Sequence, residues 1–199
     1  KIVERLRGKR GTKVKVGLKR DNVEELVEVE ILRDKIPIFS IDAAFMLRPE
    51  VGYIRLTSFA RTTHKEFLEA VARLKEEGMT KLVFDLRSNS GGYLDQAIKM
   101  TNEFLPAGQL MVYTEDKYGN QQKEYSTGGG TLTDIPLVVL IDDYSASSSE
   151  ILAGALQDND RGTIVGRRSF GKGLVQRPID LPDGSMIRIT TARYYTPSG

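Results

Sequence analysis

The spacing of apolar and polar residues changes near residues 35–45. Ahead of that point, apolar residues alternate with charged ones over Lys13–Val16 and Leu26–Ile31, and this period of two predicts a pair of half-buried strands. Val3–Arg7 is typical of the end of a helix. Because Ile36–Pro37 interrupts the alternation, we place a boundary in this region.

From Gly52 onward the chain alternates between strand patterns and helix patterns. The apolar residues of 64–77 recur at spacings of three and four, which predicts a helix capped by Thr62 or Thr63 and ended by Gly78. We expect strands over 52–56, 81–86, 110–114, 137–141 and 163–166, helices over 94–105 and 147–156, a loop over 127–133, and further strands up to Tyr195. Strands that alternate with helices predict an α/β fold.

Composition narrows the classes of function. The 199 residues suffice for one domain and a little more, and 29 basic against 27 acidic residues give a net charge of +2, so we expect no nucleic-acid partner. The absence of cysteine excludes thiol nucleophiles, thiolate metal sites and disulfides, and the single histidine, His64, excludes a metal site of several imidazoles. No apolar run approaches the roughly 20 residues of a membrane-spanning helix. The chain starts at Lys1 without Met, so we expect a fragment.

The first segment that could carry chemistry is Asp85–Gly92. A buried strand is expected to end here, and Gly91 and Gly92 come at the start of the next helix. Glycine permits unusual dihedral angles, and exposed N–H groups at a helix start can bind an anion or a developing oxyanion. A tight strand-to-helix turn without any chemistry is the competing interpretation.

The second segment is Asp142–Glu150, between an apolar strand and an apolar helix. A serine hydroxyl at such a junction lies at the positive end of a helix, among small residues that leave room for a substrate, which suits a nucleophile. The Gly-x-Ser-x-Gly elbow is missing. A serine with Glu150 a few residues later also matches the capping box of a helix N-terminus. On this segment alone, helix capping is the simpler interpretation.

The third segment is Gly166–Gly173. Its spacing matches a phosphate-binding loop, but Gly173 stands where Ser or Thr should hold magnesium, and the residues that follow indicate a strand instead of a helix. Lys172 lies between glycines and ahead of apolar residues, a setting in which an amine can be desolvated. If the segment is extended, Lys172, Leu174 and Gln176 point to the same side.

His64 is the one histidine that could serve as the base of a Ser-His-Asp protease. It comes in the first turn of a helix, where a surface role is the simpler interpretation. A serine enzyme built from this chain would therefore use lysine as its base, which is a known variant of the triad.

Taken together, the three segments resemble the carboxyl-terminal processing proteases, or tail-specific proteases, of the S41 serine peptidase family. The family pattern Asp-Leu-Arg-x-Asn-x-Gly-Gly corresponds to Asp85–Gly92, Ser-Ala-Ser-x-x-Glu-Ile to Ser145–Ile151, and Phe-Gly-Lys-Gly-x-Val-Gln to Phe170–Gln176. The final residues, Tyr194–Gly199, are also similar, and the resemblance covers about residues 52–199.

The resemblance implies the roles of individual site residues. Ser147 matches the nucleophile, Lys172 the general base, and Gln176 the residue that orients the lysine amine. The backbone N–H of Ser148 and that of a glycine in Gly91–Gly92 match the oxyanion hole. The implied mechanism proceeds through an acyl-enzyme intermediate and needs neither a metal nor any other cofactor.

The resemblance also implies the fold and the function. We expect an α/β fold with a crotonase-like and ClpP-like spiral core over residues 35–199, truncated at its carboxyl end. Residues 1–34 are expected to be the C-terminal part of a PDZ domain that lacks its carboxylate-binding glycine loop. The implied function is a serine endopeptidase of the periplasm or cell envelope. Its partner would be a protein or peptide with an unstructured or exposed carboxyl-terminal tail, which it cleaves.

Two alternatives stay open. A catalytically incompetent fragment or relative would keep the fold and act as a peptide-binding scaffold; the truncated PDZ part favours this, whereas Ser147, Lys172 and Gln176 argue against it. An acyl-CoA enzyme of the crotonase fold would use oxyanion donors without needing a Ser–Lys pair.

Overall fold

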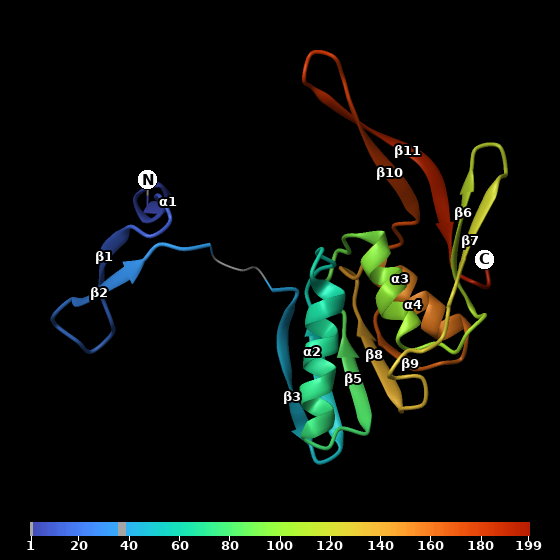
Figure 1. The fold of residues 1–199 in the computed structure, drawn as a ribbon, viewed down its shortest axis with the longest axis horizontal. Coiled ribbons are helices and arrows are strands. Elements are labelled where there is room, and N and C mark those ends of the chain that lie inside the picture. Colours follow the sequence, from blue (N-terminus) through green and yellow to red (C-terminus); the bar gives the residue numbers. More distant parts are fainter. Residues whose placement is uncertain (1, 36–38) are drawn as a thin grey trace. The chain divides into compact units, whose positions relative to one another are not determined.

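The computed structural model describes residues 2–35 and 39–199, and the chain forms two compact units, residues 1–38 and 39–199 (Figure 1). The division falls inside the region 35–45, where the spacing of apolar residues changes. The expected interruption at Ile36–Pro37 lies outside the described residues.

The first unit consists of a short helix and a two-stranded hairpin. α1 (Ile2–Leu6) precedes β1 (Lys13–Leu18) and β2 (Val27–Leu32), which pair antiparallel. The Arg33 guanidinium ties the helix to the hairpin, since its Nε donates to the carbonyl of Leu6 at 2.8 Å. The expectation of half-buried strands is confirmed for β1, where Val14 and Val16 are partly buried and alternate with exposed lysines, but it is wrong for β2. β2 is exposed along its whole length, because no second layer covers it among the described residues of the unit.

The second unit is built around a five-stranded sheet of order β3-β4-β5-β8-β9. β3 runs antiparallel to β4, and the other strands are parallel to one another. Their bounds are Ile41–Arg48, Val51–Leu56, Lys81–Asp85, Leu137–Ile141 and Thr163–Gly166. The last four confirm the sequence predictions to within one residue. β3 has no predicted counterpart, because a continuous run of apolar residues hides the period of two.

Three helices belong to the same unit: α2 (Thr63–Glu76), α3 (Leu94–Asn102) and α4 (Ser148–Asp158). All three occur where the sequence predicts a helix, which confirms the α/β prediction. α3 ends earlier than predicted, because Leu105 precedes Pro106, and a residue before proline disfavours helical dihedral angles. Across residues 2–35 and 39–199, no helix is long and apolar enough to cross a membrane.

Aromatic rings join the helices to the sheet. Phe67 of α2, Phe84 of β5 and Phe104, just after α3, are fully buried, and their ring centroids lie 5.4, 5.7 and 5.9 Å apart in tilted arrangements. Buried aromatic side chains remove large apolar areas from water, and tilted pairs add to that stabilisation. This packing fixes the carboxyl end of β5, where the glycine turn begins.

A second, antiparallel sheet has the order β10-β11-β6-β7. Its strands are Leu174–Asp180, Met186–Tyr195, Leu110–Asp116 and Gln121–Tyr125. β10 and β11 extend away from the helices as a long hairpin (Figure 1). β7 was not indicated by the sequence pattern, because it is polar and exposed along its whole length. The last residues of β11, at the base of the hairpin, lie beside α4.

Candidate active site

Ser147 stands where the segment after β8 enters helix α4, and it is the N-cap residue of that helix. Its φ of 56° and ψ of −114° are unusual for a residue with a side chain, since a sparsely populated backbone conformation of this kind costs about 1–3 kcal/mol. Such strain persists only where the surroundings hold it, and it clusters at functional sites. The junction that the sequence singles out for a nucleophile is thus a strained point of the backbone.

Gly91 and Gly92 lie directly against this junction. Gly91 has a φ of 98°, and a Cβ there would stand 2.9 Å from the Cβ of Ser147 and 3.0 Å from the amide nitrogen of Ser148. Gly92 has a φ of 152°, and a Cβ there would overlap the carbonyl oxygen of Phe59. Both positions therefore require glycine because backbones approach each other closely, and not only because of their dihedral angles.

Two backbone N–H groups beside Ser147 remain available to a ligand. Gly91 donates its N–H to Oδ1 of the buried Asn89 at 2.9 Å, whereas the N–H of Gly92 has no acceptor among the described residues. Ser148 is the first residue of α4, and the N–H groups of a first helical turn have no carbonyl partner within the helix. Donors at the positive end of a helix can hold a negatively charged oxygen.

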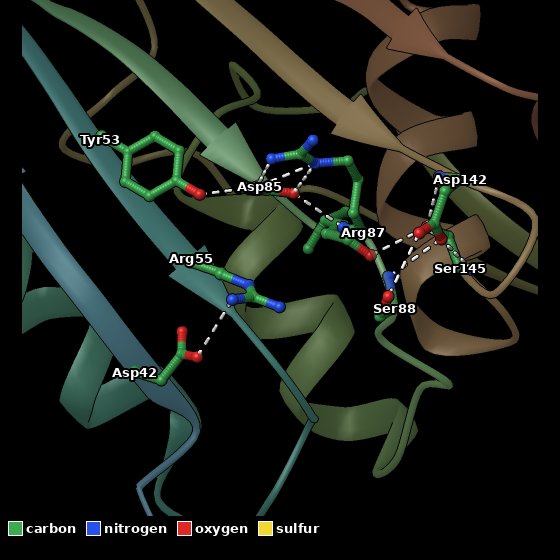
Figure 2. Close-up of polar contacts among 9 residues, drawn as sticks. Asp42, Tyr53, Arg55, Asp85, Arg87, Ser88, Asp142 and Ser145 are labelled. Carbon is green, nitrogen blue, oxygen red and sulfur yellow. Dashed lines mark hydrogen bonds and ion pairs between the residues drawn. The ribbon is translucent and has the colours of Figure 1, made fainter. Parts of the chain in front are cut away.

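Asp142 joins the glycine turn to the serine junction, as Figure 2 shows. Its Oδ1 accepts the N–H groups of Ser88 at 2.9 Å, Tyr144 at 3.0 Å and Ser145 at 3.1 Å. Burial alone would raise the pKa of Asp142, but these donors outweigh burial and hold the pKa below its ordinary value. Ser145 completes the link, because its hydroxyl donates to the carbonyl of Leu86 at 2.8 Å.

A second carboxylate, Asp85, ends strand β5 and is fully buried. Arg87 donates to it from Nη2 at 2.6 Å and from Nε at 3.0 Å, and the hydroxyl of Tyr53 donates at 2.6 Å (Figure 2). Burial acts to raise the pKa of Asp85, but these hydrogen bonds and the guanidinium charge hold it below its ordinary value. The ion pair anchors the start of the glycine turn on the sheet.

Glu150 fastens the lysine segment to the serine. Its Oε2 accepts the N–H groups of Ser147 and Lys172, both at 2.8 Å. Its Oε1 accepts the N–H of Gly171 at 2.6 Å and the hydroxyl of Ser169 at 2.7 Å. The capping interpretation is therefore correct for the carboxylate, which binds the N-cap amide. The same carboxylate also sets the spacing between Ser147 and Lys172.

Ser147 and Lys172 line one cavity of about 210 Å³. Ile151 of α4 and the two tyrosines at the end of β11, Tyr194 and Tyr195, also line it. Burial raises the pKa of Tyr194, so its hydroxyl stays protonated at neutral pH. The structure thus brings the serine of the second segment and the lysine of the third to the same hollow.

The surroundings of Lys172 differ from the expectation of a desolvated amine. Lys172 is exposed, and the exposed fractions of Phe170 and Leu174 are 66% and 41%. The segment is a loop in which Gly171 takes a φ of 89°, and it is not a continuation of strand β10. A loop on the surface cannot cover its own lysine, so the apolar neighbours in the sequence do not bury it.

Gln176 lies within β10 and is exposed. The pairing of β10 with β11 is irregular between Val175 and Gln176, so the alternation of sides does not run back from Gln176 to Lys172. Among the described residues, no hydrogen bond joins the two side chains. The expectation that they point to the same side depended on an extended segment, which the loop at Lys172 does not provide.

His64 is not part of this cavity. It lies in α2, and its Nε2 is 2.8 Å from Oε1 of Glu103, a nearly buried residue. In residues 2–35 and 39–199, no group of three or more His, Asp or Glu side chains could hold a metal ion. The third segment leads from β9 through a loop to β10 without a helix, which is the reason for rejecting a phosphate-binding loop.

Sequence reasoning missed the part that Asp142, Tyr144 and Phe170 take in the site. An aspartate three residues ahead of a serine is a signal for a turn held by side-chain hydrogen bonds, and it could have indicated Asp142. Phe170 is close to Lys172 in the sequence, but nothing in the sequence pattern could have placed Tyr144 beside them, because it reaches the same pocket only through the fold.

Comparison with known proteins assigns most of the chain to one family. Residues 50–199 match the family model described as Peptidase family S41. A carboxyl-terminal-processing protease of Synechocystis sp. is 41% identical over 196 residues, which cover 97% of this chain and 45% of the relative. The carboxy-terminal processing protease CtpA of Bacillus subtilis is 37% identical, covering 98% of this chain and 41% of the relative.

The solved structures agree with this assignment. A photosystem II D1 C-terminal processing protease aligns with a TM-score of 0.73 at 34% sequence identity, covering 96% of this chain and 53% of that chain. The present chain thus spans about half the length of the relatives that it matches.

Proposed function

The chain belongs to peptidase family S41, and from this membership we propose that it is a serine endopeptidase that cuts unstructured or carboxyl-terminal tail segments of proteins. The observation that carries the proposal is the position of Ser147. It is a strained N-cap residue that shares a cavity with Lys172 and lies against the glycine turn.

The proposed mechanism uses Ser147 as nucleophile and Lys172 as base. Neutral Lys172 takes the proton of the Ser147 hydroxyl while Oγ attacks the peptide carbonyl carbon. The N–H groups of Gly92 and Ser148 donate to the oxyanion, because the N–H of Gly91 is already bound to Asn89. The lysine ammonium then protonates the leaving amine, and water hydrolyses the acyl-enzyme.

Gln176 has the proposed role of orienting the amine of Lys172. It reaches that amine only after a change in the exposed loop, since the two side chains are not hydrogen-bonded in the described residues. Binding of a substrate over the loop would supply such a change. Neither a metal nor another cofactor takes part in the proposed reaction.

The remaining features of the proposal follow from the family resemblance. The two sheets and three helices of residues 35–199 would form a crotonase-like and ClpP-like spiral core, and residues 1–34 would be the last part of a PDZ domain. The names of the relatives support the proposal that the substrate is a protein processed at its carboxyl end. The proposed location is the periplasm or cell envelope.

The test replaces the proposed nucleophile. Ser147→Ala should abolish cleavage of an unfolded protein with an apolar tail, measured by gel electrophoresis, while circular dichroism shows an intact fold. Ser185→Ala, in the exposed turn between β10 and β11, is the matched control and should cleave like the parent. Undiminished cleavage by Ser147→Ala would overturn the proposal.

The same assay separates a lysine base from a histidine base. Lys172→Arg should be nearly inactive, because a guanidinium stays protonated at any workable pH. His64→Ala should stay active, since His64 is bound to Glu103 and lies outside the Ser147 cavity. The opposite pair of results would replace the Ser–Lys mechanism by one that uses histidine.

The exposure of Lys172 favours a second candidate function, a peptide-binding scaffold that does not cut. A fluorophosphonate probe distinguishes the two, because it phosphonylates only an activated serine. Labelling that Ser147→Ala removes would support the peptidase. Binding of a tail peptide by a chain that the probe leaves unlabelled would support the scaffold.

A further inference from the structure

A second pocket shares Lys172 with the Ser147 cavity. Its volume is about 500 Å³. Each of the three segments discussed above contributes two residues to it. The lining residues are Ser88, Ser90, Tyr144, Ala146, Phe170 and Lys172. Ala146 directly precedes Ser147, so the pocket begins next to the atom that would attack a substrate.

Two aromatic side chains form exposed walls of this pocket. The exposed fraction is 66% for both Tyr144 and Phe170, which is high for large apolar side chains. Their backbones are nonetheless held in place. The N–H of Phe170 donates to the carbonyl of Ser145 at 3.0 Å, and that of Tyr144 donates to Asp142 at 3.0 Å. Exposed aromatic side chains on a backbone that is held in this way are typical of surfaces that bind a ligand.

The charges of the pocket exclude some ligands. No carboxylate is among the described residues that line it, and Asp142, which lies behind it, already accepts hydrogen bonds from Ser88, Tyr144 and Ser145. The one basic residue that lines it is Lys172, whose charged form repels a cationic side chain and whose neutral form is the base of the proposed mechanism. An anionic side chain would hold Lys172 in its charged form. The class of ligand that remains is therefore an uncharged, apolar side chain.

We propose that this pocket, which we call the Tyr144–Phe170 pocket, is the subsite for a large apolar side chain of the substrate residue next to the bond that is cut. The proposal rests on the peptidase function proposed above and adds the class of residue that the site selects. A side chain seated between the two rings also covers Lys172, which the chain by itself leaves exposed. Substrate and protein together thereby exclude water from the base.

The experiment uses quenched fluorescent peptides that differ at one position. One series carries Leu, Ala, Asp or Lys on the amino side of the cut bond, and a second series carries them on the carboxyl side. For one of these series, the full chain should cleave the Leu peptide at least about tenfold better than the Ala peptide in kcat/KM, the discrimination that a pocket gains from a few methylene groups. Asp and Lys peptides should be cleaved worst.

Variants locate the preference in the pocket. Phe170→Ala and Tyr144→Ala should reduce the Leu-over-Ala ratio to within about threefold, because each removes a wall that the larger side chain contacts. Tyr118→Ala removes a similarly exposed ring from the turn after β6 and should keep the parental ratio.

The outcomes separate this proposal from the proposed function. An unchanged Leu-over-Ala ratio in both ring variants, with cleavage that still needs Ser147, would overturn the subsite and leave the peptidase standing. A parent that prefers Asp or Lys peptides would also overturn it. If no peptide is cleaved and Ser147 is not labelled, the peptidase function itself fails, and the subsite falls with it.

Discussion

Gly91 shows how one residue couples fold and chemistry in this protein. Its α-carbon lies so close to the serine junction that a single methyl group would meet the carbonyl oxygen of Ala146 at 2.8 Å and the Cβ of Ser147 at 2.9 Å. The glycine is therefore a spacer that lets the turn and the nucleophile approach each other. A change there acts on the position of Ser147 as well as on stability.

Gly91→Ala should lower both the free energy of unfolding and the rate at which a fluorophosphonate labels Ser147. The matched control is Gly119→Ala, because Gly119 has a similar positive φ of 83° but no neighbouring atom within 4 Å of the place that a Cβ would take. Gly119→Ala should cost only the dihedral strain, about 1–2 kcal/mol, with the labelling rate unchanged. Urea unfolding and fluorophosphonate labelling measure the two effects. Equal losses in both variants would show that close approach at Gly91 is unimportant.

At the scale of single residues, the sequence predicts a site that contains Ser147 and Lys172, and the structure brings both residues to one cavity. The family resemblance singled out these two positions, because each segment alone has a simpler structural interpretation. Exposure of Lys172 could not be predicted in this way, because burial depends on which segments cover a loop. The apolar residues beside it, Phe170 and Leu174, are themselves exposed and do not bury the amine.

At the scale of elements, the carboxyl ends of two parallel strands, β5 and β8, place the glycine turn and the serine junction side by side. Asp142 then fastens the two segments. Its carboxylate accepts the N–H of Ser88, a residue with a φ of 61°, and so stabilises a strained backbone at the start of the turn. Loss of that charge should loosen the turn.

Asp142→Asn should make the chain less stable at neutral pH but not in acid. The lowered pKa of Asp142 means that its contribution is complete above the ordinary carboxyl value of 3.8 and is lost as the pH falls through the lower folded value. The amide keeps the shape but not the charge, so we expect a loss of about 1 kcal/mol at pH 7. Urea unfolding of both proteins at neutral and acidic pH measures it.

The neighbouring carboxylate provides the control for this comparison. Asp143 is exposed and directly follows Asp142 in the sequence, so Asp143→Asn removes the same charge without the same hydrogen bonds. It should leave stability nearly unchanged at either pH. A deficit for Asp142→Asn that is as large in acid as at pH 7 would contradict a role for the charge.

Elements with strong periodicity can be predicted from the sequence. Strands that form only because they pair with a neighbouring strand cannot. α2 carries apolar residues at helical spacing, and the sequence locates both of its ends to within one residue. β3 has a run of apolar residues without alternation, and β7 is polar throughout, so only pairing with β4 and β6 makes them strands. The prediction of half-burial is wrong for β2 for a related reason, since alternation predicts a face but not what covers it.

At the scale of the whole molecule, burial is distributed unevenly. The centre of the five-stranded sheet is fully buried, as at Ile54, Phe84 and Val139. By contrast, the outer part of the β10–β11 hairpin pairs only with itself, because β11 meets β6 only from Ala192 onward. Two strands without a third are marginally stable in water. The hairpin therefore depends on the sheet at its foot.

Hydrogen exchange should reveal this difference within one chain. Amides of the outer hairpin, such as those of Arg177 and Ile187, should exchange at least about 100-fold faster than that of Phe84, since local opening costs far less than global unfolding. Ile179, Ile187 and Ile189 form an exposed apolar face on this hairpin, because Ile179 pairs with Ile187 and Ile189 lies two residues on. Protection there as strong as at Phe84 would contradict the prediction and would mean that another surface covers that face in solution. Mass spectrometry of the exchanged chain at several concentrations distinguishes these results, because protection by a second copy would rise with concentration.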